Sequence, residues 1–344
     1  MHMADALISP AVGGTMWAVT AGLIGYSSNK VKKELDDRKV PLMGVLGAFI
    51  FASQMINFTI PATGSSGHLG GGMILAILLG PHAAFLTMAS VLTIQALFFA
   101  DGGLLALGCN IFNLGFFPCF IAYPFIYKKI VGDEPTQGRI MIGALISAIV
   151  GLQMGAFCVV LQTLFSGISE LPFGPFVLLM QPIHLGIGLV EGFITAAVVN
   201  FIWRARPEIL SSAAMSMPIG ELSIRRVLIG LLATVIFTGV ALSWFASTHP
   251  DGLEWSMFKT AGTEELEHPE HGVHASLAHI QEKTAFLPDY SFKTKAPEHE
   301  AVAQPSWPAV DPGTSLSGLV GSALTLFVAL LIGLALRRRR DTKA

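Results

Sequence analysis

Residues 70–100 read GGGMILAILLGPHAAFLTMASVLTIQALFFA, an almost wholly apolar run that is interrupted once, at Gly80-Pro81. A proline inside a helix breaks or kinks it, so this run predicts two short membrane spans, near 70–80 and 82–100. Whether this run forms one span or two decides on which side of the membrane every later segment lies. Seven other apolar stretches are long enough to cross about 30 Å of hydrocarbon; they lie near 11–28, 41–60, 104–127, 140–165, 176–203, 225–246 and 316–336.

The composition predicts a membrane protein. The 344 residues are 52% hydrophobic and only 13% charged, whereas soluble domains carry about 25% charged residues. The net charge of −2 argues against a nucleic-acid partner. Most of the 21 Lys and Arg residues fall in four clusters, at 30–39, 128–139, 204–226 and 337–343.

These clusters test the number of spans. With nine spans and the N-terminus outside, all four clusters are cytoplasmic, as the positive-inside rule requires. With eight spans, the clusters at 204–226 and 337–343 would lie outside. We therefore predict an all-α, multi-pass protein with its C-terminus in the cytoplasm.

The same pattern predicts two units. Residues 1–203 hold seven spans, and a polar cytoplasmic linker follows over 204–224. Residues 225–344 form a two-helix unit that brackets an outer loop, 247–315, rich in Pro, Glu and His. Polar side chains concentrate in the first unit, which is therefore expected to hold any site. Among them, His184 and Glu191 fit either a metal or proton role or a buried hydrogen-bond network.

The chain begins Met1-His2, a dipeptide that can chelate a metal ion. A histidine in second place leaves the initiator methionine uncleaved. The amine of Met1, the amide nitrogen of His2 and the His2 imidazole can then supply three nitrogens in one plane. One equatorial position remains open, and a fourth nitrogen would complete a planar set that suits Ni(II) or Cu(II) better than Zn(II).

His68 is a candidate for that fourth position. It ends the loop Pro61-Ala62-Thr63-Gly64-Ser65-Ser66-Gly67-His68, which the predicted topology puts on the same side of the membrane as the N-terminus. The alternative is an ordinary interfacial histidine that is hydrogen-bonded to a carbonyl. The sequence by itself leaves both interpretations open.

Several motifs resemble one family, the CbiM/NikM substrate-specific component of nickel/cobalt energy-coupling-factor transporters, a kind of ABC transporter. The resemblance covers 1–203, and the later part resembles the two-helix partner CbiN/NikN, here fused in one chain. The motifs are Met1–Pro10 (MHMADALISP), 63–69 (TGSSGHL), 77–81 (ILLGP) and 95–103 (QALFFADGG) with Asn110 and Asn113, followed by 249–255 (HPDGLEW) and 288–290 (PDY).

The resemblance implies a planar metal site made by Met1, His2 and His68. Asp5, Thr63, Ser65 and Ser66 are then expected to orient these ligands through hydrogen bonds. The expected cargo is Ni(II) or Co(II), with nickel favoured because a strict nitrogen plane suits it. The family often has Pro-Asp-Gly-Phe or Met-Glu-Gly-Phe where this chain has Ala4-Asp5-Ala6-Leu7, so the metal is not assigned by simple transfer.

The resemblance also implies partners: a transmembrane coupling protein of the CbiQ/NikQ type and a pair of cytoplasmic ATPases of the CbiO/NikO type. The chain has no phosphate-binding Gly-x-x-x-x-Gly-Lys-Ser/Thr loop, so the ATPases are expected to supply the energy. We expect a component of an ATP-driven importer in a prokaryotic cell (inner) membrane, serving for example cobalamin biosynthesis, with no catalytic residue and no resident cofactor. The alternatives are a membrane metalloenzyme, although no His-Glu-x-x-His is present, and a metal sensor.

Overall fold

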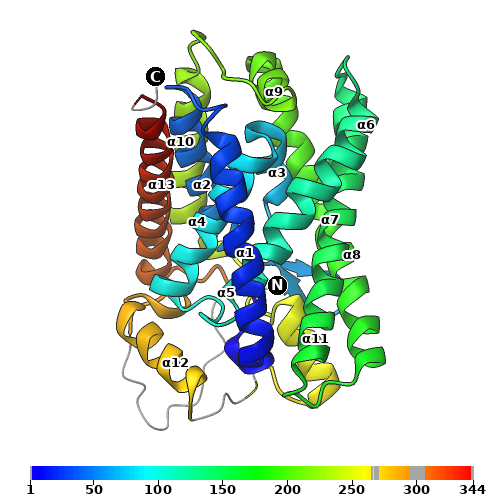
Figure 1. The fold of residues 1–344 in the computed structure, drawn as a ribbon. Helices are drawn as coiled ribbons and strands as arrows, with labels where there is room; N and C mark the ends of the chain where they lie inside the picture. The colour runs from blue at the N-terminus through cyan, green and yellow to red at the C-terminus, as the bar shows by residue number, and fades with distance from the viewer. Residues whose placement is uncertain (1, 265, 267–270, 294–306, 342–344) are drawn as a thin grey trace.

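The computed structural model describes residues 2–264, 266, 271–293 and 307–341, and it is predominantly helical (Figure 1). Met1 lies outside the described residues. The helices of the first part of the chain are η1 Asp5–Leu7, α1 Pro10–Val31, α2 Lys39–Gln54, α3 Gly72–Leu79, α4 Pro81–Phe99, α5 Leu107–Ile111, the π-helical η2 Phe112–Tyr127, α6 Lys128–Val131, α7 Gln137–Ser166 and α8 Phe173–Ala205. Those that follow are α9 Pro207–Ala214, α10 Arg225–Val240, η3 Leu242–Phe245, α11 Gly252–Ala261, α12 Val273–Thr284, η4 Pro288–Tyr290 and α13 Pro312–Asp341.

The predicted break at Gly80-Pro81 is confirmed. Gly80 has φ 81°, a conformation that favours glycine, and Pro81 is the first residue of α4. However, α3 has only 8 residues, which at about 1.5 Å per residue make about 12 Å. It is too short to cross about 30 Å of hydrocarbon alone, so the predicted span near 70–80 is not a complete transmembrane helix.

Within the described residues, five helical segments are long and apolar enough to cross a membrane, and α2 is a shorter apolar helix. The chain is thus a multi-pass membrane protein, whereas the count of nine spans stays a prediction. The five segments are Pro81–Phe99, Leu107–Val131, Gln137–Ser166, Phe173–Ala205 and Pro312–Arg337.

Two short strands depart from the all-helical prediction. The apolar stretch predicted to run to residue 60 ends as a helix at Gln54, and β1 (Phe58–Ile60) pairs antiparallel with β2 (Ser65–Gly67). The loop with three hydroxyl residues is therefore the tip and second strand of a hairpin. His68 directly follows this hairpin.

The helices of the C-terminal unit pack on the first unit along α2. Both α10 and α13 contact α2 and each other (Figure 1), and their backbones approach closely where Gly239 meets Gly318. The predicted polar linker contains α9, whose Ile209, Leu210 and Ala213 are buried, and α9 packs on α3. In Figure 1, α11 and α12 lie at the end of the molecule opposite the C-terminus.

Candidate metal-binding site

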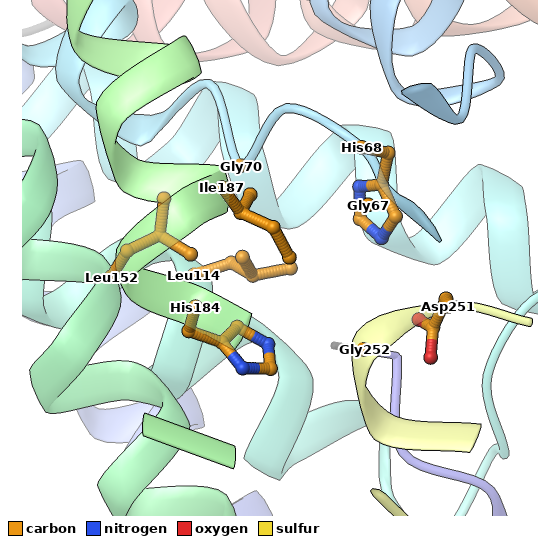
Figure 2. A pocket seen from close by; sticks show the side chains of 9 residues that line it. All are labelled: Gly67, His68, Gly70, Leu114, Leu152, His184, Ile187, Asp251 and Gly252. Atoms are coloured by element: carbon orange, nitrogen blue, oxygen red, sulfur yellow. The ribbon is translucent and has the colours of Figure 1, made fainter. Parts of the chain in front are cut away.

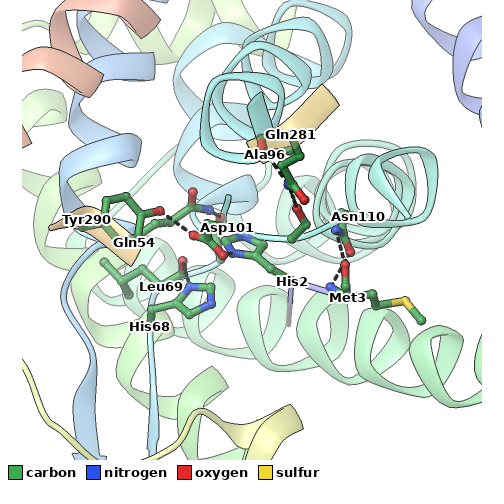
Figure 3. A network of polar contacts seen from close by, with 12 residues as sticks. His2, Met3, Gln54, His68, Leu69, Ala96, Asp101, Asn110, Gln281 and Tyr290 are labelled. Atoms are coloured by element: carbon green, nitrogen blue, oxygen red, sulfur yellow. Dashed lines mark hydrogen bonds and ion pairs between the residues drawn. The ribbon is translucent and has the colours of Figure 1, made fainter. Parts of the chain in front are cut away.

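The structure brings His2 and His68 together. Their ring centroids are 4.8 Å apart, with 30° between the ring planes, although 65 residues separate them in the sequence. Figure 3 shows the two side chains converging from the N-terminal segment and from the loop that follows β2. Met1, the third predicted ligand residue, lies outside the described residues.

The N-terminal segment is held in place by main-chain contacts. Asn110 on α5 accepts the Met3 N–H at 2.8 Å and donates to the Met3 carbonyl at 3.2 Å. The Gly103 N–H also donates to this carbonyl, at 2.9 Å. Asp5, which is buried, accepts the Ala106 N–H at 2.9 Å. These bonds fix the position of His2, because His2 immediately precedes Met3.

His2 is also held through its ring. Its Nδ1 lies 2.6 Å from Oδ1 of Asp101, in the loop after α4, and the other oxygen of Asp101 accepts the hydroxyl of Tyr290 (Figure 3). Burial raises the pKa of Asp101, but the charge and hydrogen bond of His2 outweigh it and lower the pKa to about 2. Asp101 is therefore an ionised acceptor at neutral pH. The Nε2 atom of His2 is buried and has no hydrogen-bond partner among the described residues.

The His68 ring is oriented by the neighbouring peptide group. Its Nδ1 lies 3.0 Å from the Leu69 carbonyl oxygen, which can only accept, so Nδ1 carries the hydrogen and Nε2 carries the lone pair. Burial lowers the pKa of His68 from 6.5 to about 3. The ring is therefore neutral at neutral pH, which is the state that binds a metal. The carbonyl bond that defined the alternative interpretation is present, and it is compatible with metal binding through Nε2.

The other predicted site residues bond elsewhere. Thr63 bonds the Ile60 carbonyl, and Ser65 bonds the Ser66 carbonyl. Ser66 donates its hydroxyl to the His249 carbonyl at 2.8 Å. These bonds, like that of Asp5, stabilise the hairpin or dock neighbouring segments, and none of them reaches the His2 or His68 ring. Among the described residues, no three His, Cys, Asp or Glu side chains form a metal-binding group, so the predicted ligand set depends on main-chain nitrogens.

Comparison with known proteins identifies the family. Residues 2–209 match the family CbiM, described as the cobalt uptake substrate-specific transmembrane region. The chain belongs to the CbiM family. Residues 225–338 match the PDGLE domain, and the chain carries Pro-Asp-Gly-Leu-Glu at 250–254. The fused architecture predicted from the sequence is thus confirmed.

Several relatives are metal transport proteins. The putative fused nickel transport protein NikMN of Archaeoglobus fulgidus is 30% identical over 99% of this chain and 100% of its own length. The fused nickel transport protein NikMN of Rhodobacter capsulatus is 29% identical over 61% of this chain and 64% of its own length. A crystal structure described as a truncated transition metal transporter is 30% identical, covers 60% of this chain and 99% of its own length, and superposes with a TM-score of 0.53.

The PDGLE domain contacts the segments that carry the candidate site. Trp255 on α11 donates to the Thr63 carbonyl at 3.0 Å, and His274 on α12 lies 2.9 Å from the Ile8 carbonyl. Gln281 donates to the carbonyls of Ala96 and Gly102. A cavity of about 850 Å³ lies between the two units and is lined by residues that include His2, His68, Asp101 and Tyr290.

His184 and Glu191 each make buried hydrogen bonds to backbone groups of the CbiM region. The His184 Nδ1 lies 2.7 Å from the Met180 carbonyl, and Glu191 accepts from the Gly70 and Gly71 N–H groups. His184 also lines a small cavity of about 10 Å³ together with His68 and Asp251 (Figure 2), which is enough for about one water molecule.

Sequence reasoning did not find three residues that hold the candidate site: Asp101, Tyr290 and Asn110. All three stood in the motifs that carry the resemblance, but no role followed from them. The sequence contains one signal for Asp101: it is a carboxylate that directly follows an apolar span, on the predicted outer side of the membrane. Nothing in the sequence connects it to Tyr290, which follows 189 residues later.

Proposed function

We propose that this chain is the substrate-binding membrane component of an ATP-driven importer for Ni(II) or Co(II), with nickel favoured. The convergence of the His2 and His68 rings, 4.8 Å apart, carries the proposal. This pair lies beside a docked N-terminal segment, and both imidazoles are held by fixed acceptors. The relatives named as nickel transport proteins support the cargo.

The proposed ligands are the Met1 amine, the amide and imidazole nitrogens of His2, and Nε2 of His68. Within His2, only Nδ1 can close a six-membered chelate ring with the amide nitrogen of the same residue. This Nδ1 contacts Asp101 at 2.6 Å, so the ion must replace that contact when it binds. Binding through Nε2 of His2 would instead keep the Asp101 contact, and a variant of Asp101 separates the two modes.

The proposed topology has nine spans, with the N-terminus outside and the C-terminus in the cytoplasm. Residues 1–203 form the metal-binding unit, 204–224 the cytoplasmic connection and 225–344 the accessory unit. The position of α11 and α12 at the end opposite the C-terminus supports this orientation (Figure 1). The accessory unit assists loading of the ion, since its Tyr290 bonds the Asp101 that holds His2.

Energy comes from separate proteins in this proposal. A transmembrane coupling protein and a pair of cytoplasmic ATPases act on the chain, which contains no phosphate-binding loop of its own. Reconstitution with these partners should give nickel uptake that depends on ATP. Uptake of equal rate without ATP would contradict this part of the proposal.

The site is tested with the purified full chain, after mass spectrometry has established that it starts at Met1. Nickel binding is measured by calorimetry and the bound metal by elemental analysis. His2→Ala, or a start extended by one residue, should abolish tight binding, whereas His271→Ala should not, because His271 is an exposed histidine of the outer loop. Unchanged binding by both altered chain starts would refute the proposed ligand set.

A further inference from the structure

His68 belongs to a non-helical segment, 68–71, that runs through the interior of the bundle. It connects β2 with α3, and it lies against the middle of α8, a helix long enough to cross the membrane. Residues 68–71 are buried, so their backbone N–H and C=O groups need hydrogen-bond partners. The side chains that satisfy them therefore determine where the segment lies.

Two buried side chains hold this segment from opposite sides. Glu191 on α8 accepts the Gly70 N–H at 2.7 Å with one carboxyl oxygen and the Gly71 N–H at 3.1 Å with the other. Gln54, the last residue of α2, donates to the Gly70 carbonyl at 2.9 Å. Glu191 is 2% exposed and Gln54 is 3% exposed.

The segment fits this contact only with glycine. A Cβ on Gly70 would lie 2.9 Å from a carboxyl oxygen of Glu191. Gly71 has φ 76°, and a Cβ there would lie 2.7 Å from Ile50. The two glycines bring the backbone close enough for Glu191 to bond two successive N–H groups.

One peptide group links Glu191 to the His68 ring. The carbonyl of Leu69 accepts from Nδ1 of His68, and the N–H of the same peptide group, that of Gly70, donates to Glu191. The chain of bonds therefore runs from the carboxyl group through one peptide plane to the imidazole. Bonds in such a chain polarise one another, and the outer partner orients a metal-binding histidine as a directly bonded carboxylate does.

We propose that Glu191 and Gln54 are positioning residues that hold peptide 69–70, and through it the His68 imidazole, in the orientation that binds the metal ion. This inference rests on the proposed function of His68 as a ligand. A carboxyl group inside a membrane protein is costly and usually marks a function. The alternative is a role in folding alone, in which Glu191 only accepts hydrogen bonds from the backbone before α3.

The test is a double-mutant cycle on nickel affinity in the purified full chain. Glu191→Gln leaves one acceptor oxygen for the two N–H groups of Gly70 and Gly71. One of these buried N–H groups then loses its bond, and we expect nickel affinity to fall about tenfold. In the His68→Ala background the same change should alter the dissociation constant less than twofold, because its effect passes through the missing ring. The nickel absorption band of Glu191→Gln should shift toward that of His68→Ala.

Two further variants complete the design. Asn200→Ala removes a buried polar side chain of the same helix, which donates to the Ala196 carbonyl, and it should leave affinity unchanged. Gln54→Leu removes the opposite bond and should also weaken binding only when His68 is present. It keeps the proposal testable if Glu191→Gln does not fold.

The outcomes separate the two proposals. Equal losses with and without the His68 side chain, or no loss in either positioning variant, would overturn the positioning role and leave the ligand set intact. Unchanged affinity of His68→Ala by itself would instead overturn the ligand role of His68, and the positioning role with it.

Discussion

Asn110→Ala tests whether docking of the N-terminal segment controls metal binding. Asn110 makes two buried bonds to the Met3 main chain, at 2.8 and 3.2 Å. The Met3 carbonyl keeps its bond from the Gly103 N–H, but the Met3 N–H loses the acceptor that the structure gives it. A buried group stripped of its partner costs about 1–3 kcal/mol, and we take about 2 kcal/mol as the loss in docking free energy.

This loss converts directly into affinity if the ion binds only the docked segment. Because about 1.4 kcal/mol corresponds to a factor of ten, we expect a dissociation constant for nickel about thirtyfold higher in Asn110→Ala. The assay is competition between the purified chain and a chelator of known affinity, with the thermal midpoint of the metal-free protein measured in parallel. Asn200→Ala is the matched control, since it also truncates a buried asparagine.

Nickel binding by Asn110→Ala within twofold of the parent, with similar thermal midpoints of both variants, would contradict this expectation. That result would show that the contacts of Met3 do not limit the position of His2. Equal weakening in Asn200→Ala would equally contradict it, because the effect would then follow from general loss of packing.

Three other predictions concern groups around the rings. Tyr290→Phe removes the hydroxyl that bonds Asp101 but keeps the ring stacked on Phe99. In the chelate mode it should leave nickel affinity within twofold by calorimetry, because the ion displaces Asp101 from His2; a roughly tenfold loss, the size expected for a bond to a charged group, would indicate binding through Nε2 of His2. Asp101→Asn removes the group that competes with the ion for Nδ1 of His2, so in the chelate mode affinity is kept or increased; a tenfold loss in the same titration would indicate binding through Nε2. Burial lowers the pKa of His68 to about 3, so below about pH 6.5 the unfolded chain takes up a proton that the folded chain excludes, and the folded state loses stability as the pH falls toward 3. The thermal midpoint of metal-free His68→Gln should therefore rise relative to the parent between pH 7 and pH 5, and a constant difference would show that His68 is not buried in its neutral form.

The positions of the long apolar helices and of the helix break could be predicted directly from the sequence, because hydropathy and helix-breaking residues each act over a few neighbouring positions. The break at Gly80-Pro81, the long helices α7 and α8, and the helices α10 and α13 that bracket the predicted outer loop were predictable in this way, whereas α11 and α12 inside that loop were not. The same local signal could not show that α3 has only 8 residues. Whether an apolar stretch forms a whole span or half of one depends on what packs against its neighbouring loop.

The candidate site was likewise predictable only in part. The sequence determined which residues can bind a metal, since the chemistry of Met1-His2 and His68 does not depend on the fold. Only the tertiary structure decided what orients them: Asp101 with Tyr290 on one ring, and Glu191 through peptide 69–70 on the other. These contacts join residues 99 to 189 positions apart or pass through a peptide group, and they arise from the packing of whole helices, which no local pattern records.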